Sequence, residues 1–211
     1  MNIEKRTFKK KEDTVEKIID HLSQRFLLRG YRKFSMDQIA SSLQISKKTI
    51  YKHFTNKENI VRIVLIKNLN EAYNVVITII QAKSNVVEKF IGLSEMVKKY
   101  ISIFNDASLK RLSKDMPQLA DEIIGFRENR VIPLIKLLLR IGKKKDIILD
   151  VPEEIILKVF TTSLGAIVET KNDDDQFRYD QSFVKTFNLL LSGILTKKGQ
   201  QIFKYKTEII K

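Results

Sequence analysis

Basic and hydroxyl side chains crowd one short segment of the chain, SKKTIYKHF from Ser46 to Phe54. Lysine ammonium groups neutralise phosphates and release counterions from a polyanion, which gives an affinity that depends strongly on salt. Threonine, tyrosine and histidine side chains hydrogen-bond phosphate oxygens and fix the position of a helix on a nucleic acid backbone. The segment therefore suggests nucleic-acid recognition, carried by the side chains of Lys47, Lys48, Thr49, Tyr51, Lys52 and His53.

Two short helices joined by a tight turn are expected to position these side chains. Ser35 and Gln38 have the form of a capping box at the start of the first helix, and Ser46 can cap the second helix. Apolar spacing in both helices buries one face and leaves the basic face outward. Residues at the start of such a second helix reach base edges in the major groove of DNA, so we expect Lys48 to contact guanine and Thr49 a thymine methyl.

Helices are also expected on both sides of this pair. A helix from about Asp13 has apolar residues on one face and stops at Gly30, a usual position for a helix-ending glycine. Thr55 and Glu58 form a second capping-box pattern, which predicts the start of a long helix running to about Lys83. Together these elements describe a compact three-helix module followed by a long helix.

Each outward residue also has a plain structural interpretation. A run of lysines is often a solvated helix face, Tyr51 can be a core residue whose hydroxyl reaches the surface, and His53 can be an inert surface histidine. The combination of capping boxes, apolar spacing and basic residues favours DNA binding over these separate explanations.

Charge is concentrated in the same part of the chain. The net charge is +14, and residues 1–59 hold 14 Lys and Arg against 7 acids, whereas the remaining residues hold 25 against 18. This excess calls for a polyanionic partner, either nucleic acid or an anionic membrane. We find no apolar run of membrane-spanning length and no signal peptide, and cysteine is absent. A cytoplasmic protein without a membrane partner is therefore expected.

The fold class predicted for the chain is all-α, because glycine and proline are few and apolar spacing stays helical throughout. Residues 1–59 form the helix-turn-helix domain, with a solvated basic arm at 1–12, and residues 60–211 form a larger helical domain. An Asp150–Glu153 capping pattern is expected to start a helix. The later helices are expected at about 86–105, 108–115, 117–141, 152–170 and 180–198.

The stretch from about Val15 to Ile60 closely resembles the DNA-binding domain of the TetR family of bacterial transcriptional regulators. Two positions depart from the family pattern: Gln44 replaces a turn glycine where a left-handed backbone is often needed, and Lys48 replaces a common glycine. The matching residues are Gly30, Ser35, Ile39-Ala40, Gln44-Ile45-Ser46, Ile50-Tyr51-Lys52-His53-Phe54 and Lys57-Glu58.

The resemblance implies roles for individual residues. Ser35, Tyr51, His53 and Lys57 would contact phosphates, and the positions that vary with operator sequence are Lys47–Thr49. The larger domain would bind an effector and form a homodimer, which a helix that spans only one half-site also needs for specificity.

The last two long helices, at about 152–170 and 180–198, carry the apolar faces expected at the dimer contact, although such faces can equally be intramolecular core. Those faces comprise Ile155, Ile156, Val159, Phe160, Ser163, Leu164 and Ile167, then Phe183, Phe187, Leu190, Leu191 and Ile194, with Gly165 allowing close approach.

No effector site can be assigned from the sequence. Met96, Tyr100, Phe104, Phe126 and Phe160 could line a pocket, but aromatic residues at helical spacing are more often core. Residues 60–211 contain neither His nor Cys, so no metal site, cofactor or enzymatic activity is expected.

The function expected is a sequence-specific transcriptional regulator, a repressor that a small-molecule effector releases from a palindromic operator. The alternative is a basic interaction protein that binds nucleic acid or membrane surfaces without sequence preference. The two differ in whether affinity depends on base sequence or only on charge.

Overall fold

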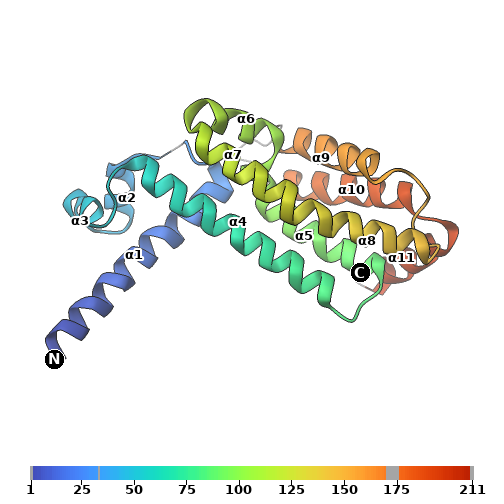
Figure 1. Cartoon of the computed structure of the whole chain (residues 1–211), viewed down its shortest axis with the longest axis horizontal. Coiled ribbons are helices and arrows are strands. Elements are labelled where there is room, and N and C mark those ends of the chain that lie inside the picture. The colour runs from blue at the N-terminus through green and yellow to red at the C-terminus, as the bar shows by residue number, and fades with distance from the viewer. Residues whose placement is uncertain (1, 33, 170–175, 210–211) are drawn as a thin grey trace. The chain divides into compact units, whose positions relative to one another are not determined.

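The structure is a computed structural model that describes the backbone of residues 2–32, 34–169 and 176–209, and the side chains of 14–32, 34–168 and 180–205. These residues form helices without a β-strand, which confirms the all-α prediction (Figure 1). The helices are α1 (Asn2–Arg29), α2 (Met36–Ser42), α3 (Lys47–His53), α4 (Lys57–Gln81), α5 (Val86–Phe104), α6 (Asp106–Asp115), α7 (Pro117–Phe126), α8 (Ile132–Lys144), α9 (Glu153–Glu169), α10 (Gln176–Ile194) and α11 (Lys197–Ile209).

The chain divides into two compact units, Met1–Asn70 and Glu71–Lys211. The boundary therefore lies inside α4, later than the boundary after residue 59 that the sequence suggested. The segment 1–12 expected as a basic arm belongs to α1, whose backbone is helical from Asn2.

The first unit is built around apolar side chains from four helices. Its fully buried residues include Ile18, Leu22 and Phe26 of α1, and Ile50 of α3. Two turns require a left-handed backbone: Gly30 has φ +74° after α1, and Gln44 has φ 53° between α2 and α3. The strained position expected at Gln44 is thus present, and the α2–α3 turn forms without glycine.

Helix caps in the first unit follow the sequence in two cases of three. Ser35 and Gln38 form the expected reciprocal capping box of α2, and Ser46 caps α3 through the Thr49 amide. The expected Thr55 cap of α4 is wrong, because the Asn59 amide donates to Asn56 Oδ1 at 2.7 Å and α4 begins at Lys57. Asparagine is as strong a cap as threonine, and here it is placed one residue later.

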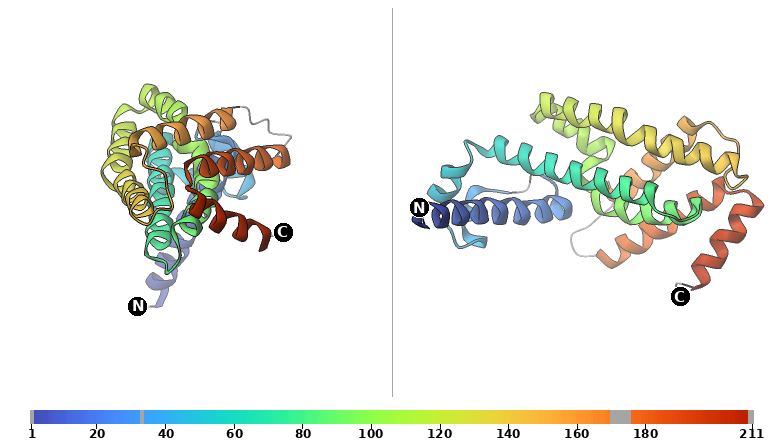
Figure 2. Two further views of the ribbon diagram at one scale, coloured as in Figure 1. Left: turned by 90° about the vertical axis from the view of Figure 1, so that its right-hand side faces the viewer. Right: turned by 60° about the horizontal axis from the view of Figure 1, so that its bottom comes forward.

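The second unit has an apolar core to which α5, α9 and α10 contribute most of their buried residues, including Phe90, Leu164 and Phe187. The helix expected from Pro117 to Ile141 is α7 and α8 joined by a π-helical turn, Arg127–Val131. Figure 2 shows the two as one nearly continuous rod.

The C-terminal part of the second unit differs from the expected single helix at about 180–198. Helix α10 ends at Ile194, and Leu195 forms an isolated bridge with Ile148. Thr196 Oγ1 then accepts the Gly199 amide at 3.1 Å and caps a further helix, α11, that the apolar pattern did not predict. The Asp150 cap expected for α9 is also not formed as predicted, since α9 begins at Glu153 and Asp150 lies 3.6 Å from Lys143 Nζ.

Helix α4 is long and apolar enough, by length and composition, to cross a membrane, contrary to the expectation of no such run. This is weak evidence for a membrane span, because core helices of water-soluble proteins meet the same criterion. Its residues Ile60, Val64 and Leu65 are buried in the first unit, and Val76 belongs to the core of the second. Its apolar side chains therefore have packing roles within the protein.

Candidate nucleic-acid interface

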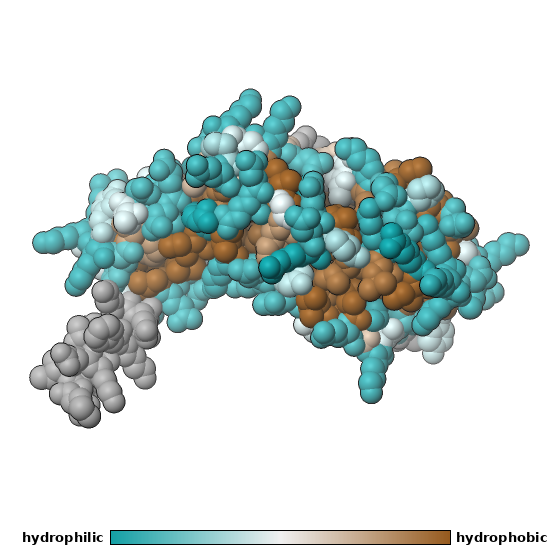
Figure 3. Space-filling model, viewed as in Figure 1, coloured by the Kyte–Doolittle hydropathy of each residue, from teal (hydrophilic) through white to brown (hydrophobic). Residues whose placement is uncertain are grey.

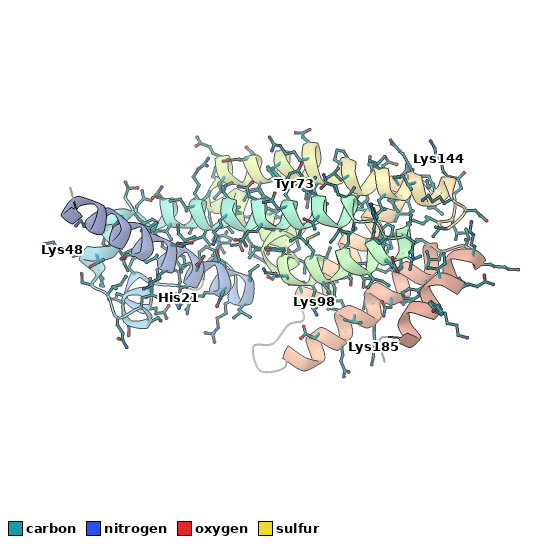
Figure 4. All side chains as sticks on the ribbon, turned by 90° about the horizontal axis from the view of Figure 1, so that it is seen from below. His21, Lys48, Tyr73, Lys98, Lys144 and Lys185 are labelled. Atoms are coloured by element: carbon teal, nitrogen blue, oxygen red, sulfur yellow. The ribbon has the colours of Figure 1, made fainter. Side chains whose placement is uncertain are left out.

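Helix α3 separates its apolar and polar residues onto different faces. Ile50 is fully buried and Phe54, directly after the helix, is 2% exposed, whereas Tyr51 is 51% exposed. Lys48 and Lys52 are exposed as well, and Lys48 projects outward from the first unit (Figure 4). The structure thus excludes the interpretation of Tyr51 as a core residue, and the outward face combines ammonium and phenol groups.

Thr49 is held at the start of α3 by Ser46. Its amide donates to Ser46 Oγ at 3.0 Å, and the two hydroxyl oxygens lie 2.9 Å apart. The side chain is half-buried. This contact orients the Thr49 methyl and hydroxyl groups, and Lys48 beside it keeps more freedom to reach a base edge.

Lys47 forms an ion pair with Asp37 of α2, with 2.6 Å between Nζ and Oδ1. The hydrogen bond and charge of Asp37 raise the pKa of the Lys47 ammonium above its usual value. Asp37 was not singled out from the sequence, because the two residues are ten positions apart and meet only through the packing of α2 on α3. The pair fixes the start of α3 relative to α2, and it places a carboxylate beside the basic face.

Lys57, expected as a phosphate contact, also braces the first unit. Its ammonium donates to the carbonyl oxygen of Phe34 at 3.1 Å and lies 4.5 Å from the centre of the Phe34 ring. The Phe34 ring in turn lies 5.2 Å from that of Phe26. This links the first turn of α4 to the segment that leads into α2.

Ser35, the other expected phosphate contact outside α3, is exposed at the start of α2. Its Oγ accepts the Gln38 amide at 3.2 Å, and the Gln38 side chain also accepts from Arg25 of α1 at 3.0 Å. His53 is half-buried at the last residue of α3. The eight predicted contact residues therefore come from α3 and from the first residues of α2 and α4.

The faces predicted for dimerisation are only partly on the surface. Ile156, Leu164, Phe183, Phe187 and Leu191 are buried within the second unit, so these five belong to the intramolecular core. Because α9 packs on α10, one side of each apolar face is buried between the two helices.

Other residues of α9 and α10 remain exposed. Ile155 and Val159 are 54% and 45% exposed, and Val184 and Leu189 add apolar surface on α10. A Cβ added at Gly165 would lie 3.8 Å from Asn105 Cβ, an ordinary contact, so packing within the chain does not require glycine there.

The aromatic residues considered for an effector pocket contact other side chains. Tyr100 is buried and donates from its hydroxyl to Glu71 at 3.3 Å. Phe126 packs edge-on against Tyr73, and Phe160 against Phe187. A surface cavity of about 460 Å³ lies elsewhere, beside α8 and the start of α9, and none of these residues lines it.

Comparison with known proteins identifies the first unit. Residues 18–64 match the sequence model of the bacterial regulatory proteins of the TetR family. No curated protein sequence matches the chain.

Solved structures share the fold over most of the chain. They include the ketosteroid transcriptional regulator KstR2 of Mycobacterium tuberculosis, with 17% identity, a TM-score of 0.65, and coverage of 86% of this chain and 95% of that chain. A protein from Saccharomonospora viridis in complex with choline has 18% identity and a TM-score of 0.64, with coverage of 88% of this chain and 100% of that chain. AibR in complex with isovaleryl coenzyme A and operator DNA has 16% identity and a TM-score of 0.59, with coverage of 83% of this chain and 97% of that chain.

The matched segment contains the helix pair and all eight predicted contact residues. The solved structures extend the likeness in fold to the second unit. Residues 18–64 therefore form a helix-turn-helix domain of the TetR type, and the chain shares its fold with these solved structures over most of its length.

Proposed function

We propose that the protein is a cytoplasmic, homodimeric repressor that binds a palindromic operator and is released by a small-molecule effector. The observation that carries the DNA-reading part is the outward face of α3, where Tyr51 is 51% exposed between two exposed lysines while Ile50 beneath it is fully buried. The exposed side chains of this face do not contribute to the packing of the chain, because the apolar residues of α3 already do so. They are therefore available to contact DNA.

Each predicted contact has a role in this proposal. Lys48 and Thr49 read base edges, and Lys47 supports them at the helix start. Tyr51, Lys52, His53, Lys57 and Ser35 contact phosphates. The capping bonds of Ser35 and Ser46 leave backbone amides oriented at two helix starts, which adds positive potential toward the phosphates.

The dimer forms through the exposed sides of α9 and α10. Ile155 and Val159 lie one turn apart on α9, and Leu189 is 73% exposed on α10. Two copies that meet on these faces would bury apolar surface that the single chain leaves in water. A two-fold dimer presents two α3 helices to successive major grooves, about 34 Å apart.

The effector is proposed to bind in the second unit and to change the separation of the two α3 helices. A shift of a few ångströms is enough to disturb a spacing of about 34 Å. Choline and isovaleryl coenzyme A occur in complexes of proteins with this fold, which supports a small organic ligand here without identifying it.

The experiment is a gel shift and footprint on DNA upstream of the protein's own gene and its neighbours. We expect a protected inverted repeat, altered base preference in Lys48→Ala, and weaker binding with unchanged preference in Lys52→Ala. The Val159→Arg variant should lose the α9–α10 dimer and, with it, the footprint. Equal losses on operator and unrelated DNA for both lysine variants would favour the alternative, a charge-driven interaction protein.

A further inference from the structure

The rod formed by α7 and α8 carries its charges in two separate halves. The charged residues of α7 are Asp121 and Glu122, both acidic, whereas all those of α8 are basic: Lys136, Arg140, Lys143 and Lys144. Of the two arginines in the intervening turn, Arg127 pairs with Asp106 at 3.1 Å and Arg130 lies over the Phe126 ring. The turn also carries Glu128.

Several of these charges have no ion-pair partner among the residues that the structure describes. Asp121, Glu128 and Lys144 are exposed, and the structure records no ion pair for them among the residues it describes. Arg140 is 61% exposed and reaches Glu153 only at 3.8 Å. Figure 4 shows Lys144 directed outward at the end of α8. Charges of both signs are therefore available on one rod.

The available acidic charges lie before Pro133 and the basic ones after it, with Glu128 and Arg140 at 5 and 7 residues from it. Asp121 precedes Pro133 by 12 residues and Lys144 follows it by 11, about 18 and 16 Å along a helix. When two such rods lie antiparallel about a two-fold axis near Pro133, Asp121 faces Lys144 of the second copy, and Glu128 lies beside its Arg140. Every pair then occurs twice, as a two-fold axis requires.

Apolar surface lies between the charged halves. Leu137 is 47% exposed at the middle of the outward face, and Pro133 beside it is exposed as well. Leu137 and Ile141 also line the cavity of about 460 Å³, together with Arg140 and Lys144. Figure 3 shows apolar surface between polar side chains on the face of the second unit viewed there. Asp150 and Glu153 line the same cavity and lie near Arg140 and Lys143, so Lys144 is the cation at its edge with no recorded ion pair among the described residues.

We propose that the outward face of α7–α8 is a second self-association surface, on which another copy of this chain docks antiparallel. The occupant is a second copy because the rod is acidic in α7 and basic in α8, so two antiparallel copies place each half against its opposite charge. Within the second unit, α8 and α10 lie on opposite sides (Figure 2), so this surface is separate from the proposed α10 contact. Two dimers joined in this way form a tetramer.

Sedimentation of the full-length chain without DNA tests the proposal. Asp121→Lys/Glu128→Lys and Arg140→Glu/Lys144→Glu should each lower the association constant of this step at least about tenfold, since each change acts twice per interface. The two variants mixed in equal amounts, or all four changes in one chain, should recover association. Lys110→Glu/Lys114→Glu on α6 makes the same charge change as the α8 variant at another place, and it should leave the association constant unaltered.

The test is independent of the proposed α9–α10 dimer. In the Val159→Arg background, α7–α8 association should still yield dimers, and its strength should fall as salt is raised. If circular dichroism shows that a reversal disturbs the fold, Asp121→Asn/Glu128→Gln replaces it, with a smaller loss expected. Absence of any association step that responds to the α7 or α8 reversals, or failure of the mixed variants to associate, would overturn the proposal.

Discussion

Lys47 and Lys48 are neighbours in the sequence but have different surroundings. Lys47 is tied to Asp37 at 2.6 Å, whereas Lys48 is exposed at the start of α3 and the structure records no ion pair for it among the described residues. An ammonium that is already hydrogen-bonded must give up or share that bond to contact DNA. Lys48 is thus the better candidate for contacting a base, because the ammonium of Lys47 is already paired with the carboxylate of Asp37.

Replacing Asp37 should strengthen DNA binding. In Asp37→Asn the pKa of Lys47 falls toward its ordinary value, the lysine stays charged at neutral pH, and a negative charge leaves the basic face. We expect affinity to rise about three- to tenfold on all DNA, with a steeper salt dependence and unchanged base preference. Fluorescence anisotropy between about 50 and 200 mM salt measures this. The Asp115→Asn change in the second unit is the control, and weaker binding of Asp37→Asn would contradict the account.

Lys57 is expected to affect stability as well as binding. Its ammonium joins the Phe34 carbonyl and ring, so Lys57→Ala should lower the free energy of unfolding by about 1 kcal/mol. Lys52→Ala, which removes the same group from α3, should leave it within about 0.5 kcal/mol of wild type. Chemical denaturation compares the two variants. Equal stability of both would show that the Lys57 contact contributes nothing measurable.

Acid should remove the stabilisation that the Glu154 carboxylate, in the first turn of α9, gives to the fold. The hydrogen bond from Lys136 to Glu154, at 2.6 Å, lowers the pKa of that carboxyl from its ordinary value. A depressed carboxyl pKa stabilises the fold above the unfolded pKa, and the effect is lost as pH falls through the folded value. Glu154→Gln should therefore be less stable than wild type at pH 7 and equal to it at the acid end. Thermal melts from pH 7 to about pH 3 measure the difference, and a pH-independent gap would argue against an ion pair.

Individual helices depend on close approaches that only glycine allows. A Cβ added at Gly199 in α11 would lie 2.3 Å from the Ile147 carbonyl oxygen, and one at Gly142 would lie 2.5 Å from the Ile148 side chain. A Cβ at Gly193 of α10 would meet no atom within 4 Å. The α11 backbone at Gly199 is therefore packed directly on the backbone at Ile147, whereas Gly142 of α8 leaves room for the Ile148 side chain.

Substitution of these glycines by alanine should have opposite effects. Gly199→Ala must move either α11 or the segment at Ile147, and we expect a loss of about 2–3 kcal/mol in the free energy of unfolding. Gly193→Ala should gain about 0.5–1 kcal/mol, since alanine is the better helix former. Urea unfolding followed by circular dichroism measures both. A neutral Gly199→Ala would mean that this junction is looser than the structure shows.

Local signals predicted the first unit better than the second. The Ser35 box, the Ser46 cap and the end of α1 at Gly30 depend on residues within four positions of each other, and all three are present. The π-turn at Arg127–Val131 and helix α11 depend on packing between distant segments, for which spacing along the chain carries no signal. The same reason explains why Asp37 was missed.

For the protein as a whole, we propose one helix that contacts DNA and two exposed faces for self-association. Sequence spacing found the α9 and α10 stripes but could not separate their buried sides, such as Phe183, from exposed residues such as Val159. Both sides are apolar, and only the packing of the two helices decides which is outward. The proposed dimer uses the apolar residues of α9 and α10 that stay exposed. Apolar spacing gave no indication of the α7–α8 face.

Whether α3 reads base sequence can be measured by selection from a random double-stranded DNA library with the full-length protein, repeated with Lys48→Ala. We expect the wild type to enrich an inverted repeat with half-site centres about 34 Å apart or a multiple of it, and Lys48→Ala to change the preferred base within each half-site. Libraries that show no enriched sequence, with retention that varies only with salt, would contradict this expectation.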